Sequence, residues 1–249
     1  NNSTVFNAVL QNLVDQKFPV NDDMKEDAAT IIKQIKSAYK SNYGDNYKDS
    51  LNQALTSAGY KNLSEYRQKM IKQIQYANFL LDYIDDHFDD VFNDYYQQCA
   101  PKYVSLIKIS VSDTSSPTDD ETSKLNEVKE LISNTDKSFG DIAQDYSNDS
   151  TSSKKGSLGI VDSKDTSGIA NSYGKDVFNA IEALSEGQVS DVITGDDGYY
   201  FVKVTSTDKK NLKKELKKTD IDSPLLAYDD YLQYVVYNSY KINYKDKDI

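Results

Sequence analysis

The sequence predicts an α+β fold in which a discontinuous helical domain carries an inserted domain, a small antiparallel-rich sheet flanked by helices. Three observations predict it. Apolar residues recur with helical spacing over residues 1–101. At Lys102 the pattern changes to the alternation typical of strands, and short strands and helices follow up to residue 212. Residues 213–249 then hold one more amphipathic helix, which must pack against another element to bury its apolar face.

The first hundred residues predict a series of helices, each with one apolar stripe. Phe18-Pro19 ends the first, because the residue before a proline is pushed out of the α region. Asn21 or Asp22 can cap the second helix. Ser64 is expected to cap the longest helix, whose pattern continues weakly to the end of this segment. We therefore expect a helical bundle here.

The middle of the chain predicts the inserted domain. Ile107, Ile109 and Val111 alternate with polar residues and should share one face of a strand. The remaining expected elements are helices at 125–132 and 139–146, a strand at 158–161, a polar insertion at 162–174, a helix at 176–184 and a hairpin at 189–205.

The last part of the chain begins with a charged connector, residues 209–220. Ser223-Pro224 is a strong helix start, a capping side chain followed by proline at the first helical position. The apolar stripe of this helix runs over residues 225–236. The N-terminal bundle is its natural packing partner, which makes the helical domain discontinuous.

Composition narrows the classes of function. The chain has 249 residues and a formal net charge of −11, so its surface repels phosphate backbones and nucleic acid is not expected as a partner. The single cysteine, Cys99, excludes an internal disulfide, and no metal site or cofactor is expected. A Cys99–His87 dyad is the one thiol arrangement available, but no nucleophile signature surrounds either residue.

Several short motifs in the middle segment resemble the parvulin family of peptidyl-prolyl isomerases. They occur in the same order as in the family over the segment 102–212, and such a set of ordered motifs is hard to obtain by chance. The motifs are Phe139-Gly-Asp-Ile-Ala-Gln-Asp-Tyr-Ser147, Gly156-Ser-Leu-Gly159, Ala183-Leu-Ser-Glu-Gly-Gln-Val-Ser190 and Gly198-Tyr-Tyr-Phe-Val-Lys-Val204.

The surrounding plan, helices before this segment and one helix after it, resembles the PrsA-type foldase lipoproteins and the SurA-type chaperones. The resemblance implies an extracytoplasmic foldase that assists unfolded or partly folded secreted polypeptides. It also implies a membrane-anchored protein on the outer face of a Gram-positive cell, held by a lipid on a cysteine upstream of Asn1, and a possible homodimer. It divides the chain into a chaperone region 1–101, a parvulin-like domain 102–212 and a C-terminal helix 213–249.

The resemblance also assigns site residues. Parvulins carry two buried histidines, and this chain has Leu106 and Tyr200 at those positions. Asp149 matches the family's Asp or Cys, so Asp149 and Tyr200 are the candidate catalytic residues. Leu106, together with an apolar wall, is the candidate proline-binding surface. That wall is expected from Leu158 and from Val177 or Phe178.

Each assignment has a simpler alternative. Asp149 can be a turn residue with an Asx-type hydrogen bond, Tyr200 an ordinary strand aromatic and Leu106 a core residue. Without the histidines we expect isomerase activity that is weak or lost. Two other functions stay open: an active isomerase using Asp149 and Tyr200, and a non-enzymatic surface-binding lipoprotein.

Overall fold

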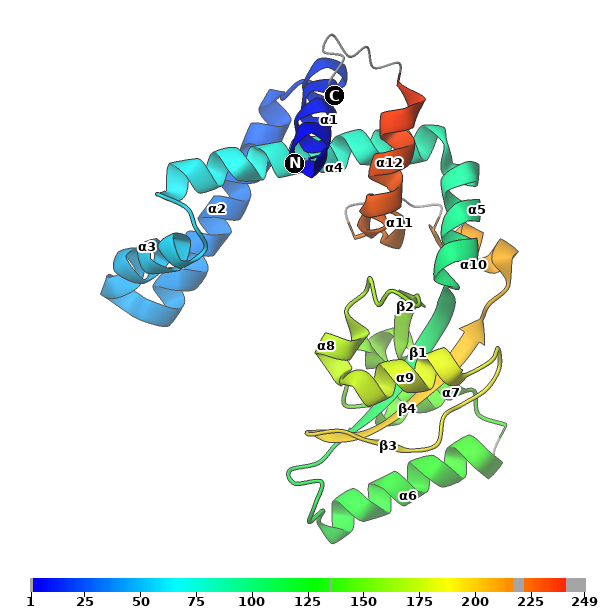
Figure 1. Ribbon diagram of the computed structural model, residues 1–249. Coiled ribbons are helices and arrows are strands. Elements are labelled where there is room, and N and C mark those ends of the chain that lie inside the picture. The colour runs from blue at the N-terminus through cyan, green and yellow to red at the C-terminus, as the bar shows by residue number, and fades with distance from the viewer. Residues whose placement is uncertain (1, 135, 217–221, 241–249) are drawn as a thin grey trace. The chain divides into compact units, whose positions relative to one another are not determined.

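The computed structural model describes residues 2–134, 136–216 and 222–240, which form two compact units (Figure 1). The helical unit comprises the described residues of 1–87 and 229–249, and the sheet unit those of 88–228. The expected α+β class with a discontinuous helical part is confirmed. The three-part division expected at 101/102 and 212/213 stays a prediction about domains. No helix of the described residues is long and apolar enough to cross a bilayer.

The helical unit is built around the long helix α4. Its elements are α1 (Asn2–Lys17), α2 (Asp22–Tyr43), the short 3₁₀ helix η1 (Gly44–Asn46), α3 (Tyr47–Ser57), α4 (Leu63–Asp86) and α12 (Asp229–Ser239). Met24 and Ala28 of α2 pack against Met70 and Ile74 of α4 in a buried apolar cluster. The hydroxyls of Tyr83 and Ser239 lie 2.9 Å apart in a hydrogen bond, which ties α12 to α4.

The helix caps follow local rules, and one of the two expected caps is wrong. Asn21 caps α2 as expected, because its side chain accepts the Met24 N–H at 2.9 Å. Ser64 does not cap α4. Asn62 does so, accepting the Glu65 N–H at 2.9 Å. Asparagine is a better cap than most residues, and α4 therefore begins two residues earlier than the expected start.

The sheet unit contains a four-stranded antiparallel sheet with the strand order β2-β1-β4-β3. Its elements are α5 (Phe88–Cys99), β1 (Lys102–Ser110), α6 (Asp119–Asn134), α7 (Phe139–Tyr146), η2 (Ser150–Lys154), β2 (Ser157–Val161), α8 (Ile169–Tyr173), α9 (Lys175–Ala183), β3 (Ile193–Thr194), β4 (Gly198–Ser206), α10 (Lys209–Leu216) and α11 (Pro224–Ala227).

Each face of this sheet is covered by its own pair of helices (Figure 1). Val104 and Leu106 point to the face covered by α8 and α9. Ile107 and Ile109 point to the face covered by α6 and α7, so the expected shared face of these two residues is confirmed. The alternation along β1 thus places the candidate residue Leu106 under α8 and α9.

Two expected helices are broken by acidic residues. The long N-terminal pattern stops at His87, where α4 ends and α5 begins. Within one continuous helix, Asp85 would repel Asp89 and Asp86 would repel Asp90 four residues on. At the start of a new helix the same carboxylates favour the positive dipole end. The C-terminal stripe breaks in the same way at Tyr228, and two aspartates begin α12.

Three other sequence expectations need correction. The polar insertion 162–174 contains the short helix α8. The first strand of the hairpin is only β3, with one isolated bridge between Val189 and Lys203 before it. The charged connector 209–220 is helical over its described part, because Leu212 and Leu216 are buried one turn apart. Residues 217–220 lie outside the described residues.

Candidate functional site

A cleft of about 620 Å³ lies beside the N-terminal end of β4, and we call it the sheet cleft. It is bounded by α8, the first turn of α9, β3 and the turn that joins β3 to β4. Its lining residues are Ala170, Asn171, Ser172, Tyr173, Gly174, Lys175, Asp176, Val177, Ile193, Thr194, Gly195, Asp196, Asp197 and Tyr200. The cleft therefore contains one of the two expected catalytic residues, Tyr200.

Tyr200 is buried, and its hydroxyl donates a short hydrogen bond to Asp197. The same carboxylate pairs with Lys108, whose Nζ lies 5.6 Å from the centre of the Tyr200 ring. Strand register explains the grouping, because Lys108 of β1 lies directly opposite Tyr200 of β4. The Lys108 ammonium and the Tyr200 hydroxyl hold the pKa of Asp197 below its usual range. Burial, and next Asp197, raise the pKa of Tyr200.

Asp149 has the geometry of the turn residue that was the simpler alternative. Its Oδ1 accepts the Thr151 N–H at 2.9 Å and the Thr151 hydroxyl at 2.6 Å, which caps η2. The Tyr173 hydroxyl lies 3.5 Å from the same oxygen, long for a hydrogen bond. Burial and Asp149 together raise the pKa of Tyr173 to about 12. Asp149 thus reaches the sheet cleft only through Tyr173.

Tyr173 connects the two expected catalytic residues. Its ring meets the Tyr200 ring edge to face, with centroids 6.2 Å apart, while its hydroxyl points to Asp149. Sequence reasoning missed Tyr173, which lies in the insertion expected to be a polar loop. It also missed Lys108 and Asp197. The position of Lys108 could have been predicted from the sequence, because it is two residues after Leu106 and therefore on the same face of β1.

The expected apolar residues belong to one buried cluster but do not share one surface. Leu106 is fully buried beneath the cleft, and Val177 is nearly so while still contributing to the lining. Phe178 is partly buried and packs against this cluster, as does Leu158. Leu106 therefore fills the core, whereas Val177 forms part of the cleft wall.

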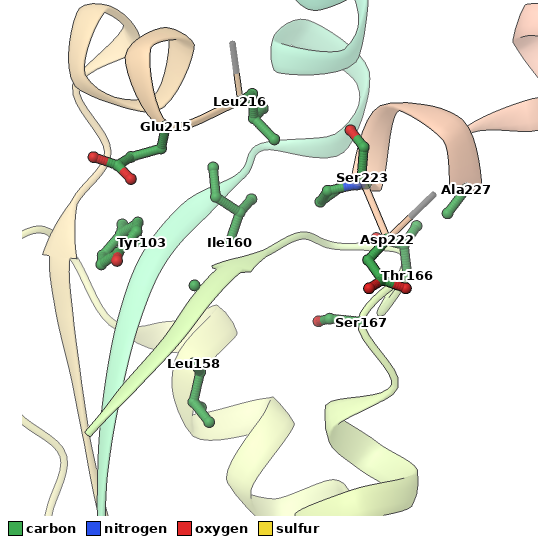
Figure 2. A pocket seen from close by; sticks show the side chains of 12 residues that line it. Tyr103, Leu158, Ile160, Thr166, Ser167, Glu215, Leu216, Asp222, Ser223 and Ala227 are labelled. Carbon is green, nitrogen blue, oxygen red and sulfur yellow. The ribbon is translucent and has the colours of Figure 1, made fainter. Parts of the chain in front are cut away.

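Leu158 lines a different hollow, of about 350 Å³, at the edge of the sheet (Figure 2). Figure 2 shows Leu158 and Ile160 on β2, with Leu216 from α10 and Ser223 at the start of α11 around the same space. This edge hollow does not include Tyr173, Val177 or Tyr200. The structure thus separates Leu158 from the other apolar residues expected to bind proline.

Cys99 and His87, the two other reactive side chains named from the sequence, do not form a second site. Cys99 is fully buried, and burial raises the pKa of its thiol to about 11, so it is a core residue rather than a nucleophile. His87 is exposed at the end of α4, where its ring stacks on Tyr83. Within the described ranges no group of three or more His, Cys, Asp or Glu side chains could hold a metal ion.

The sheet cleft offers a hydrophobic wall and two phenols to a ligand. The Tyr200 hydroxyl already donates its hydrogen bond to Asp197, so Tyr173 is the phenol more available to donate to a ligand. Twisting an Xaa-Pro amide crosses a barrier of about 18–20 kcal/mol, and a catalyst must bind the twisted form better than the planar ones. A single half-buried phenol can supply only a small part of that difference.

Comparison with protein families matches residues 106–206 to the rotamase family described as a PPIC-type PPIASE domain. The foldase protein PrsA of Staphylococcus epidermidis is 33% identical over 133 residues, which cover 51% of this chain and 38% of that protein. PrsA of Staphylococcus aureus is 32% identical over 133 residues and is covered to 39%. The chain thus spans about two fifths of the length of the curated relatives it matches.

Solved structures of PrsA proteins are also similar to this chain. PrsA from Bacillus subtilis is 22% identical, with 99% of this chain and 86% of that chain covered and a TM-score of 0.40. The foldase protein PrsA from Streptococcus pneumoniae is 19% identical, with 98% of this chain and 86% of that chain covered and a TM-score of 0.41.

Proposed function

We propose, from the premise that this chain is homologous to PrsA foldase proteins and contains a PPIC-type parvulin domain, that it is a foldase in which chaperone activity outweighs prolyl isomerisation. This proposal rests on the residues at the two strand positions where parvulins carry histidines, and on what those residues contact. Leu106 is buried and apolar, and the Tyr200 hydroxyl is bound to Asp197. Neither side chain offers a bound amide the hydrogen-bonding ring nitrogens that a histidine pair would supply.

The substrates that this proposal implies are unfolded or partly folded secreted polypeptides. By the same homology we propose an extracytoplasmic location, with a lipid anchor upstream of Asn1 on the outer face of a Gram-positive membrane. Mass spectrometry of the native protein extracted from membranes would test the anchor. A mature form without a lipid-modified cysteine would contradict it.

A protease-coupled or NMR assay of prolyl isomerisation tests the activity of the chain. We expect a rate within a few-fold of the uncatalysed reaction, because the Tyr200 hydroxyl and Leu106 supply little stabilisation of the twisted amide. Asp149→Ala and Tyr173→Phe are the matched variants, one for each side of the contact between Asp149 and Tyr173. Turnover like that of an active parvulin, lost in Asp149→Ala, would instead establish the active isomerase.

Light scattering of an aggregating, unfolded client tests the chaperone part. The proposal predicts that substoichiometric to equimolar amounts of the chain suppress scattering. No suppression at any ratio would favour the non-enzymatic surface-binding lipoprotein. These two assays are independent, so either half of the proposal can fail alone.

A further inference from the structure

The helical unit contains a small apolar pocket outside the sheet cleft, about 260 Å³ in volume, which we call the helical pocket. It lies where α2, α3 and the start of α4 meet. Its lining residues are Ile35, Tyr39, Leu51, Ala54, Leu55, Ala58, Tyr60, Leu63 and Tyr66. None of them is charged, and their only side-chain polar atoms are tyrosine hydroxyls.

The lining indicates what kind of group would fill this pocket. Tyr60 and Tyr66 meet edge to face with ring centroids 5.0 Å apart. Tyr39 stacks on Tyr43 at 5.5 Å, and Tyr43 is 53% exposed. Small-molecule sites place several polar groups to orient their ligand, which this pocket does not. Tyrosines around an apolar hollow instead suit an apolar or aromatic side chain of a polypeptide.

The charge around the helical pocket is opposite to that of the protein as a whole. Residues 33–72, which contain all of the lining residues, carry eight Lys or Arg against three Asp or Glu. The complete chain has a formal net charge of −11. A segment with a net charge of +5 within so acidic a chain is a local feature that attracts anionic groups.

Most of these cations form no ion pair with any residue that the structure describes. Lys72 pairs with Asp15. Six others are exposed and form no ion pair with any described residue: Lys33, Lys36, Lys40, Lys48, Lys61 and Lys69. Lys36, Lys40 and Lys61 each come directly after a lining residue in the sequence. Exposed lysines in the segment that forms an apolar pocket complement an acidic polypeptide that contains a large apolar side chain.

We propose that the helical pocket binds acidic segments of client polypeptides, with one large apolar side chain inserted among the tyrosines and flanking Asp or Glu residues facing the lysines. The proposal rests on the proposed chaperone function and names the class of client segment. Charge complementarity would speed capture of such segments and orient them, while the inserted side chain would supply the contact area.

Short fluorescent peptides test the proposal by anisotropy on the full chain. One peptide carries Phe-Leu between Asp and Glu residues, a second has Lys in place of the acids, and a third has Ser in place of Phe-Leu. We expect the first to bind at least roughly tenfold more tightly than the others, and its binding to weaken as salt is added. Equal or tighter binding of the lysine peptide would overturn the proposal.

Two variants locate the binding. Lys36→Glu with Lys48→Glu and Lys61→Glu reverses the charge, and Ala58→Trp at an exposed lining position obstructs the pocket. Each variant should weaken binding of the acidic peptide by about tenfold or more, because one removes the charge attraction and the other removes the apolar contact. The matched control reverses three exposed lysines of the sheet unit and should leave binding unchanged: Lys154, Lys210 and Lys214. Circular dichroism confirms that the variants stay folded.

Other occupants would give different results. Binding of phosphatidylglycerol vesicles without peptide binding, abolished by the same charge reversal, would replace the proposal with a membrane contact. Concentration-dependent self-association in sedimentation, also abolished by the reversal, would assign the pocket to a second copy of the chain. Suppression of client aggregation by the wild type without peptide binding would overturn this inference alone. Absence of suppression would overturn the proposed function.

Discussion

Lys108, which lies opposite Tyr200 on the neighbouring strand, and the lysines of residues 33–69 differ in what they contact. Lys108 is paired with Asp197, a lining residue of the sheet cleft that also accepts the Tyr200 hydroxyl. Around the pocket, six exposed lysines have no ion-pair partner among the described residues. The side chains of Lys108, Asp197 and Tyr200 bind one another, whereas the six lysines form no ion pair with any described residue. This difference agrees with the proposal that the helical unit recognises clients.

The two sites also differ in how they are assembled. Lys108 and Tyr200 lie 92 positions apart in the chain and meet through strand register. The helical pocket is made by three helices that follow one another between residues 22 and 86. The cleft therefore depends on close long-range contacts, and the pocket on helix patterns and caps. Three substitutions can break or sharpen this comparison.

The largest effect is expected at Gly156, which directly precedes β2 and lies against Leu106 of β1. Its φ is +75°, and a Cβ there would lie 2.4 Å from the Leu106 carbonyl oxygen and 2.8 Å from the Ala143 Cβ. Gly156→Ala should lower the free energy of unfolding by about 3 kcal/mol or more. Urea unfolding followed by circular dichroism measures it.

Gly159→Ala is the matched control for this change. Gly159 lies within β2 with φ +77°, but a Cβ there would meet nothing within 4 Å. It should cost only about 1 kcal/mol, the strain of a positive φ. Equal losses in the two variants would show that the approach of β2 to β1 does not limit stability, and would weaken the contrast between the units.

The next effect is expected at Asp197. Asp197→Ala leaves the buried Tyr200 hydroxyl without its acceptor and should cost about 1–2 kcal/mol. Asp197→Asn keeps an acceptor oxygen but removes the charge that faces Lys108, and should cost less than about 1 kcal/mol. Unfolding free energies at neutral pH measure both.

The pH dependence of this effect has a definite sign. The pKa of Asp197 is lowered in the folded state by Lys108 and Tyr200, so its contribution is present above its unfolded pKa of about 4 and is lost as pH falls. The pKa of Tyr200 is raised, so its contribution is present below about pH 10 and is lost as pH rises. At about pH 2.5 most carboxylates are protonated. If the difference in unfolding free energy between the wild type and Asp197→Asn were unchanged at that pH, the predicted contribution of the Asp197 charge would be wrong.

The smallest effect is expected at the start of α4, beside the helical pocket. Asn62→Ala removes the cap of the Glu65 N–H and should cost about 1 kcal/mol. Ser64→Ala, at the residue that the sequence suggested as the cap, should stay within about 0.5 kcal/mol of the wild type. Thermal unfolding of both variants gives the comparison. A larger loss in Ser64→Ala would restore the expected start of the helix.

The amino-acid sequence by itself determined the order of the elements and their class. Helical spacing in the first hundred residues, the alternation of Ile107 with Ile109, and the cap at Ser223-Pro224 are local signals, and the structure contains all three elements. The parvulin-type resemblance was also available, because its motifs are short and contiguous. The absence of histidine from residues 102–212 was also visible in the sequence, and the loss of isomerase activity expected from it stays a prediction.

Only the tertiary structure decided which residues meet. The ion pair and hydrogen bond of Asp197 with Lys108 and Tyr200 depend on the register of β1 with β4, which local patterns do not specify. Tyr173 joins Asp149 to Tyr200 because α8 forms inside a stretch that looked like polar loop. Leu158 faces a separate hollow because β2 is an edge strand. The periodicity of apolar residues predicts which face of a helix or strand is buried. Which side chains from distant segments contact one another depends on strand pairing and packing, and a site consists of such contacts.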